Sequence, residues 1–228
     1  MASRLVEFLT NGSTTTAYLS TPPSGKGPGV LVLQEWWGLV DHIKAVCDRF
    51  AGEGFSALAP DLYHGKTASE PDEAGKLFMA LSVPQVEKDL RGATRYLLQH
   101  ASAPRVGVVG FCMGGQLALF AATLDPTIGA TVNFYGIHPN VKPDYRRLSG
   151  PVLGLYAEQD AFVTPDAARA VDQAIRAAGK QSEVKIYPGV DHAFFNDERP
   201  DVHDRAAAAD AWQRTLTFFR QHLVTTAG

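Results

Sequence analysis

The 228-residue sequence has only two cysteines, Cys47 and Cys112. Two thiols are too few for a disulfide framework, so we expect both to be reduced, as in the cytoplasm. Long apolar runs are also missing, since no stretch approaches the roughly 18 residues that a membrane helix needs. The first apolar run is short and is interrupted by Glu7, so no secretion signal is expected. These absences predict a cytoplasmic protein without a membrane partner.

The sequence also lacks an excess of charge of either sign. Its 21 lysines and arginines against 24 aspartates and glutamates leave a formal charge of −3. This balance gives no electrostatic reason to bind nucleic acid. None of the seven histidines falls in a His-Glu-x-x-His or Cys/His ligand spacing, so we expect no metal and no cofactor.

What the sequence does contain is an alternation of short apolar runs with helical patterns. Buried strands are expected at 30–33, 55–59, 106–109, 131–134, 152–156 and 184–187, after an edge hairpin at about 4–20. Amphipathic helices are expected over 86–97, 168–178 and 212–223. Near-continuous apolar strands are typical of a parallel sheet covered on both faces. We predict one α/β domain over residues 1–228, with a doubly wound, mostly parallel sheet and helices on both faces.

A candidate nucleophile follows the strand at 106–109. The segment Gly110-Phe-Cys112-Met-Gly114 has the pattern G-x-nucleophile-x-G, in which a tight strand-to-helix turn exposes the central side chain. The helix N-terminus would stabilise a thiolate, and the amide of Met113 would serve as an oxyanion donor. The alternative is that Cys112 is a small buried apolar residue. Cys47, on an apolar helix face, is expected to be structural.

A candidate acid and a candidate base follow the nucleophile in the sequence. Asp160 comes after the strand at 152–156, and His192 comes after the strand at 184–187. The order nucleophile, acid, histidine is that of the α/β-hydrolases. His192 would take the proton from Cys112, and Asp160 would orient the imidazole. Glu158 and Asp191 are nearby competitors for the role of the acid.

The loop after the first buried strand reads Gln-Glu-Trp-Trp-Gly over 34–38. In this arrangement it would supply the second oxyanion amide, which we assign to Trp36. Glu35 either points away to solvent or takes part in activating the thiol, because a carboxylate beside a thiolate disfavours the thiolate. The tryptophans are either core residues or pocket wall. The candidate substrate-pocket residues are Trp37, Tyr135, Phe194 and Asn196.

Five segments together carry a resemblance to a known family. They lie at 34–38, 59–63 (Ala-Pro-Asp-Leu-Tyr), 110–115, 156–160 and 191–194. In order and in sequence they resemble the dienelactone hydrolases, or carboxymethylenebutenolidases, of the α/β-hydrolase superfamily. The resemblance implies a triad of Cys112, His192 and Asp160. It also implies that Glu35 keeps the resting thiol neutral and helps to deprotonate it when substrate binds.

One position departs from the family. The resemblance implies an arginine four residues after the histidine that binds a substrate carboxylate, and this sequence has Asn196 there. A second arginine is expected within 70–79, where only Lys76 is cationic. Asparagine cannot replace the bidentate guanidinium fork, which argues against dienelactone itself as the substrate.

The sequence therefore predicts a cysteine-dependent hydrolase of small esters or lactones that forms a thioester acyl-enzyme. We expect it to act as a monomer or a small homo-oligomer. Two alternatives stay open. A redox-sensing thiol protein would use Cys112 as a peroxide sensor, although a nearby resolving cysteine is missing. A non-catalytic binding module could be built on the same fold.

Overall fold

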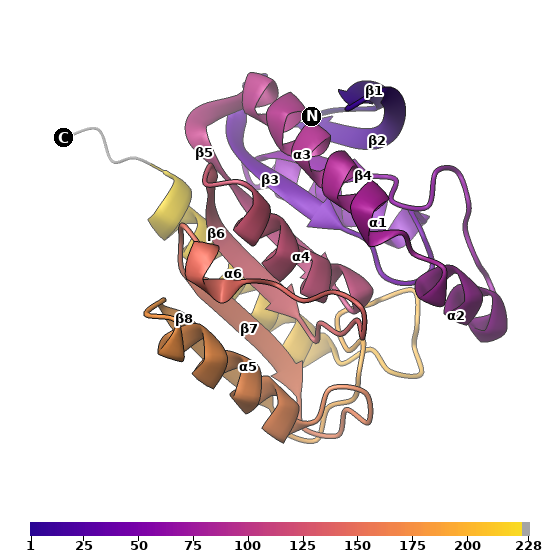
Figure 1. Ribbon diagram of the computed structural model, residues 1–228, viewed down its shortest axis with the longest axis vertical. Helices are drawn as coiled ribbons and strands as arrows, with labels where there is room; N and C mark the ends of the chain where they lie inside the picture. Colours follow the sequence, from indigo (N-terminus) through magenta and orange to yellow (C-terminus); the bar gives the residue numbers. More distant parts are fainter. Residues whose placement is uncertain (225–228) are drawn as a thin grey trace.

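The computed structural model describes residues 1–224, and over these residues the strands form one eight-stranded sheet (Figure 1). Its strand order is β1-β2-β4-β3-β5-β6-β7-β8. The strands are β1 (Ala2–Thr10), β2 (Ser13–Thr21), β3 (Gly27–Leu33), β4 (Ser56–Pro60), β5 (Ala101–Phe111), β6 (Ile128–Phe134), β7 (Val152–Ala157) and β8 (Ser182–Tyr187). The first hairpin is antiparallel and joins β4 in antiparallel fashion, and all further pairs are parallel. The predicted doubly wound, mostly parallel sheet is confirmed.

Helices cover both faces of this sheet. They are α1 (Asp41–Gly52), α2 (Pro71–Met79), α3 (Val83–His100), α4 (Met113–Leu124), α5 (Pro165–Ala177) and α6 (Arg205–Leu223), with a 3₁₀ turn at Tyr145–Arg147. The apolar side chains of α1 and α6 pack in one core, and those of α3 and α4 pack in another. In Figure 1, α3, α4 and α5 lie in front of the strands and α6 lies behind them. Two covered faces explain why the central strands are apolar throughout.

Local sequence signals explain individual helices. The α5 helix begins after Thr164, whose hydroxyl accepts a hydrogen bond from the Ala167 N–H at 3.2 Å, and Pro165 occupies the first helical position. Such a cap satisfies one of the amides that a helix start leaves free. On α1, Cys47 is fully buried beside Val46 and Phe50, as predicted for a structural cysteine.

The loops that follow the parallel strands all leave from one edge of the sheet. Those after β3, β5, β6, β7 and β8 carry the candidate residues of the sequence, because the carboxyl ends of parallel strands meet at the same edge. Among residues 1–224, no helix combines the length and the apolar character needed to cross a bilayer.

Candidate active site

Cys112 occupies a strained turn between β5 and α4. Its backbone has φ 52° and ψ −119°, a region that costs energy for a residue with a side chain. A Cβ at Gly110 would collide with the carbonyl group of Gly114, so the turn requires glycine there. The Cys112 N–H donates to the Phe134 carbonyl at 3.0 Å, which ties the turn to the end of β6. The thiol is thus held at the sheet edge, directly before the first residue of a helix.

Met113, that first residue, has an N–H without an acceptor inside α4, because the first turn of a helix leaves its amides free. The side chain of Cys112 is adjacent to this amide in the chain and is 9% exposed. The second predicted donor, Trp36, lies in the loop after β3, half-buried, with its ring centroid 5.2 Å from that of Trp37.

His192 and Asp160 are joined by a short hydrogen bond. The distance between His192 Nδ1 and Asp160 Oδ2 is 2.6 Å. The other carboxylate oxygen, Oδ1, accepts hydrogen bonds from the backbone amides of Phe162 at 2.7 Å and Val163 at 2.8 Å. The Asp160 side chain has no exposed surface, whereas that of His192 is 15% exposed. Asp160 is therefore fixed by the loop after β7, and it orients the imidazole.

The pKa of His192 reflects contact with two partners. Burial alone lowers it, but hydrogen bonds from the ring to Asp160 and to Cys112 outweigh burial and raise the pKa to about 10. Since Asp160 takes Nδ1, Nε2 is the ring nitrogen left to interact with Cys112. The ring lies between Tyr135, at 4.9 Å between centroids, and Phe162, at 5.1 Å. At neutral pH this arrangement favours an imidazolium beside the sulfur of Cys112.

The two competing acids have other surroundings. Glu158 accepts a hydrogen bond from the Gly189 amide at 2.8 Å, which joins the loops after β7 and β8. Asp191 is exposed at the surface. Of the three nearby carboxylates, Asp160 is the one bonded to His192.

Glu35 is buried rather than directed to solvent. Glu35 is only 2% exposed, so the alternative in which its carboxylate points away to solvent is wrong. Oε2 accepts a hydrogen bond from Asn196 Nδ2 at 2.7 Å, and Oε1 accepts one from the Tyr135 hydroxyl at 3.5 Å. Burial, followed by the charges of Glu35 and Cys112, raises the pKa of Tyr135. The Tyr135 hydroxyl therefore stays protonated and can donate.

The four predicted pocket residues divide into two pairs. Trp37 and Asn196 line a pocket of about 270 Å³. Tyr135 and Phe194 are fully buried, with ring centroids 5.4 Å apart, and they support the site from the core without presenting surface to it. Phe194 also packs on Tyr187, at 5.1 Å, and this explains its burial.

Two further aromatic residues lie at the site. The Tyr63 hydroxyl donates to the sulfur of Met113 at 3.2 Å, and burial, followed by the Cys112 charge, raises the pKa of Tyr63. Phe162 is 63% exposed and meets the His192 ring edge-on. In the sequence, the segment that ends at Tyr63 indicated only the family resemblance. Both residues directly neighbour strand-end motifs, which is the signal that could have revealed them.

Metal sites in proteins are commonly built from histidine, cysteine, aspartate and glutamate side chains. Within residues 1–224, no three of these side chains are grouped as metal ligands.

Comparison with known proteins shows the family of this chain. The model of the "Dienelactone hydrolase family" matches residues 15–223. This chain belongs to the dienelactone hydrolase family. "Protein usf" of Aquifex pyrophilus is 41% identical over 96% of this chain and 99% of its own length. A relative from Aquifex aeolicus, "Putative carboxymethylenebutenolidase", is 36% identical over 96% of this chain and 99% of its own length.

A solved structure of the same family confirms the fold. The crystal structure titled "Putative Dienelactone Hydrolase" from Klebsiella pneumoniae superposes with a TM-score of 0.86 at 32% identity. The superposition covers 97% of this chain and 100% of that one. The predicted α/β-hydrolase fold and the predicted family are thereby confirmed, and the protein is a hydrolase of the dienelactone hydrolase type.

Proposed function

We propose that this dienelactone hydrolase family member cleaves small carboxylic esters or lactones through a thioester on Cys112. The observation that supports this most directly is the chain of contacts from Asp160 through His192 to Cys112 at a strained strand-to-helix turn. A merely structural cysteine would have no reason to be held in a left-handed conformation beside a charged imidazole.

In the proposed reaction, the Cys112 sulfur attacks the carbonyl carbon, and the carbonyl oxygen becomes an oxyanion. The amides of Met113 and Trp36 stabilise that oxyanion. When the intermediate collapses, the bond to the alkoxy oxygen breaks, and His192 donates its proton to the departing oxygen. A water molecule then attacks the thioester while His192 accepts its proton. Collapse of this second intermediate releases the acid and restores the Cys112–His192 pair, with Asp160 orienting the imidazole throughout.

The surroundings of Glu35 favour neutral substrates. The carboxylate is held by two uncharged donors, the Asn196 amide and the Tyr135 hydroxyl. Asn196 is 3% exposed, and its Oδ1 accepts a hydrogen bond from the Glu198 amide at 3.1 Å. Both ends of the Asn196 side chain are thus engaged within the protein. We therefore propose small neutral esters or lactones as substrates, and that Glu35 restrains the resting thiol.

The first test is the release of p-nitrophenol from p-nitrophenyl acetate. Cys112→Ala should remove the nucleophile and lower kcat by roughly a thousandfold or more. Cys47→Ala is the matched control, since Cys47 is buried on α1, and it should leave turnover unchanged. Full activity of Cys112→Ala would refute the assignment. Rapid peroxide oxidation of Cys112 without ester turnover would instead favour the redox-sensor alternative.

The second test concerns the charge of the substrate. Asn196→Arg should raise the kcat/KM for cis-dienelactone, relative to that for p-nitrophenyl acetate, by roughly tenfold, because a guanidinium can bind a carboxylate through two hydrogen bonds. Asn196→Gln is the matched control that lengthens the side chain without adding charge. A wild-type enzyme that already prefers cis-dienelactone would contradict the proposed preference for neutral substrates.

A further inference from the structure

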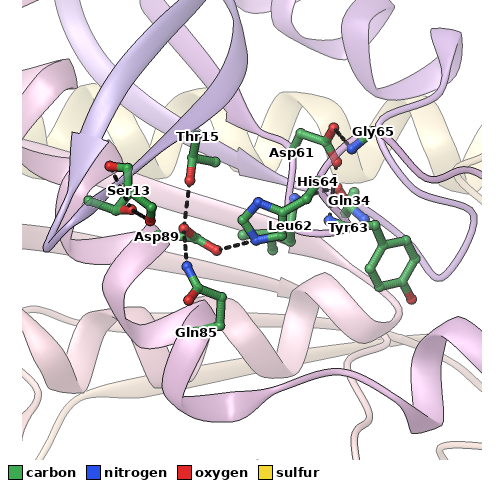
Figure 2. Close-up of polar contacts among 11 residues, drawn as sticks. Ser13, Thr15, Gln34, Asp61, Leu62, Tyr63, His64, Gly65, Gln85 and Asp89 are labelled. Carbon is green, nitrogen blue, oxygen red and sulfur yellow. Dashed lines mark hydrogen bonds and ion pairs between the residues drawn. The ribbon is translucent and has the colours of Figure 1, made fainter.

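A second histidine–aspartate contact lies outside the proposed triad. His64 Nε2 is 3.0 Å from Asp89 Oδ2 (Figure 2). Asp89 belongs to α3, and its side chain has no exposed surface, whereas that of His64 is 43% exposed. The other oxygen of Asp89 accepts hydrogen bonds from the Thr15 hydroxyl at 2.7 Å and from the Gln85 amide at 3.1 Å. Asp89 thereby joins β2, α3 and the segment that carries His64.

That segment, residues 61–68 between β4 and α2, is called here the Tyr63 loop. The Asp61 carboxylate shapes it by accepting hydrogen bonds from the amides of Tyr63 at 3.1 Å and Gly65 at 2.6 Å. His64 has φ 52° and Gly65 has φ 89°, so two consecutive residues are left-handed. Figure 2 shows the result, in which the His64 ring turns towards Asp89 while the Tyr63 ring leaves the loop on the opposite side.

The Tyr63 loop contacts both segments that carry the proposed oxyanion amides. On one side, the Tyr63 hydroxyl donates to the Met113 sulfur at 3.2 Å. On the other side, the Leu62 amide donates to Gln34 Oε1 at 3.2 Å, and the Ala68 amide donates to the Trp37 carbonyl at 3.0 Å. Met113 directly follows Cys112, and Trp36 lies between Gln34 and Trp37. A shift of this loop would therefore move the donors relative to the sulfur.

We propose that His64 and Asp89 are a positioning pair for the reaction. Their contact fixes the Tyr63 loop, and the loop fixes the spacing between the Met113 and Trp36 amides. This inference rests on the proposed function, because it assigns a purpose to the oxyanion donors. Neither residue touches substrate in this arrangement. Oxyanion donors act mainly in the transition state, so weakening the pair should lower kcat and leave KM nearly unchanged.

The test is a double-mutant cycle. His64→Gly removes the ring and keeps a residue that tolerates positive φ, so that loss of the contact is separated from backbone strain. Asp89→Asn keeps the shape of the side chain and removes its charge. Each single variant should lower kcat for p-nitrophenyl acetate by roughly tenfold, with KM changed less than about twofold. The double variant should lose no more than either single variant, because the two residues act through one contact.

The matched control is Asp48→Asn. Asp48 on α1 also accepts side-chain hydrogen bonds from the first hairpin, from Ser3 at 2.6 Å and from Tyr18 at 3.0 Å. Its partners are on β1 and β2, so kcat should be unchanged. In every variant, alkylation of Cys112 counts the folded sites, and kcat is expressed per reactive thiol.

Two results would overturn the positioning pair and leave the proposed function intact. One is an unchanged kcat per reactive thiol in both single variants while Cys112→Ala is inactive. The other is a double variant whose loss is the product of the two single losses, because that would show two independent effects. An active Cys112→Ala protein would instead overturn the proposed function itself.

Discussion

At the scale of single residues, the buried acids Asp160 and Glu35 have different hydrogen-bond partners. Asp160 receives two backbone amides and the His192 ring, so that its charge faces an imidazolium. Glu35 receives a side-chain amide and a phenol. A carboxylate that is hydrogen-bonded to a charged imidazole ring stabilises the charge of that ring. A carboxylate that is bonded only to neutral donors has no cationic partner, so its negative charge still acts on neighbouring groups. This difference agrees with the proposed roles, in which Asp160 orients the imidazole and Glu35 restrains the thiol.

The ionisation of His192 should appear in the stability of the folded protein. Its folded-state pKa of about 10 lies above the ordinary value of 6.5. A raised pKa stabilises the folded state fully below pH 6.5, and that contribution is lost as pH rises through about 10. The advantage of wild type over His192→Gln in unfolding free energy should therefore shrink across this interval. Urea unfolding at several pH values measures it.

The difference in unfolding free energy between wild type and His192→Gln removes the contributions of all titrating groups that both proteins share. Two parallel stability curves across that interval would mean that His192 is not held as a cation in the folded protein.

At the scale of elements, burial decides what the sequence could predict. The α3, α5 and α6 helices were predicted because each buries an apolar face, and such a face repeats every three or four residues. The α2 helix buries only Ala74, so its pattern gave no comparable signal. The start of β5 at Ala101 was also missed, because its first residues are partly exposed.

The candidate site was predictable where its residues directly follow predicted strands. Cys112, Asp160 and His192 each follow a predicted strand, so their meeting at one sheet edge follows from the fold. The burial of Glu35 was not predictable, because it depends on the direction of a side chain leaving an irregular loop. The left-handed turn at His64 is such a case, because positive φ is uncommon even for the non-glycine residue types, histidine among them, that are enriched there.

At the scale of the whole molecule, the core behind the sheet packs directly against the strand that leads to Cys112. Phe219 of α6 is fully buried, and a Cβ at Gly107 of β5 would lie 2.6 Å from its ring. Gly107 is in the same strand that ends at the Cys112 turn, at a distance of about 16 Å for a strand rise of about 3.3 Å per residue. The core behind the sheet and the site at its edge therefore share one strand.

This continuity predicts a single unfolding transition. Phe219→Ala should lower the unfolding free energy by about 3–5 kcal/mol, because the cavity it leaves is lined by rigid aromatic rings, including Phe50 at 6.0 Å between centroids. Activity per folded molecule should be unchanged, since the ring is remote from Cys112. Far-UV circular dichroism and the fluorescence of Trp36 and Trp37 in the loop after β3, measured with Trp212 of α6 replaced by phenylalanine, should give coincident curves. If the signal of Trp36 and Trp37 changed before the helical signal, the loops of the site would unfold separately, and the prediction of a single unfolding transition would be wrong.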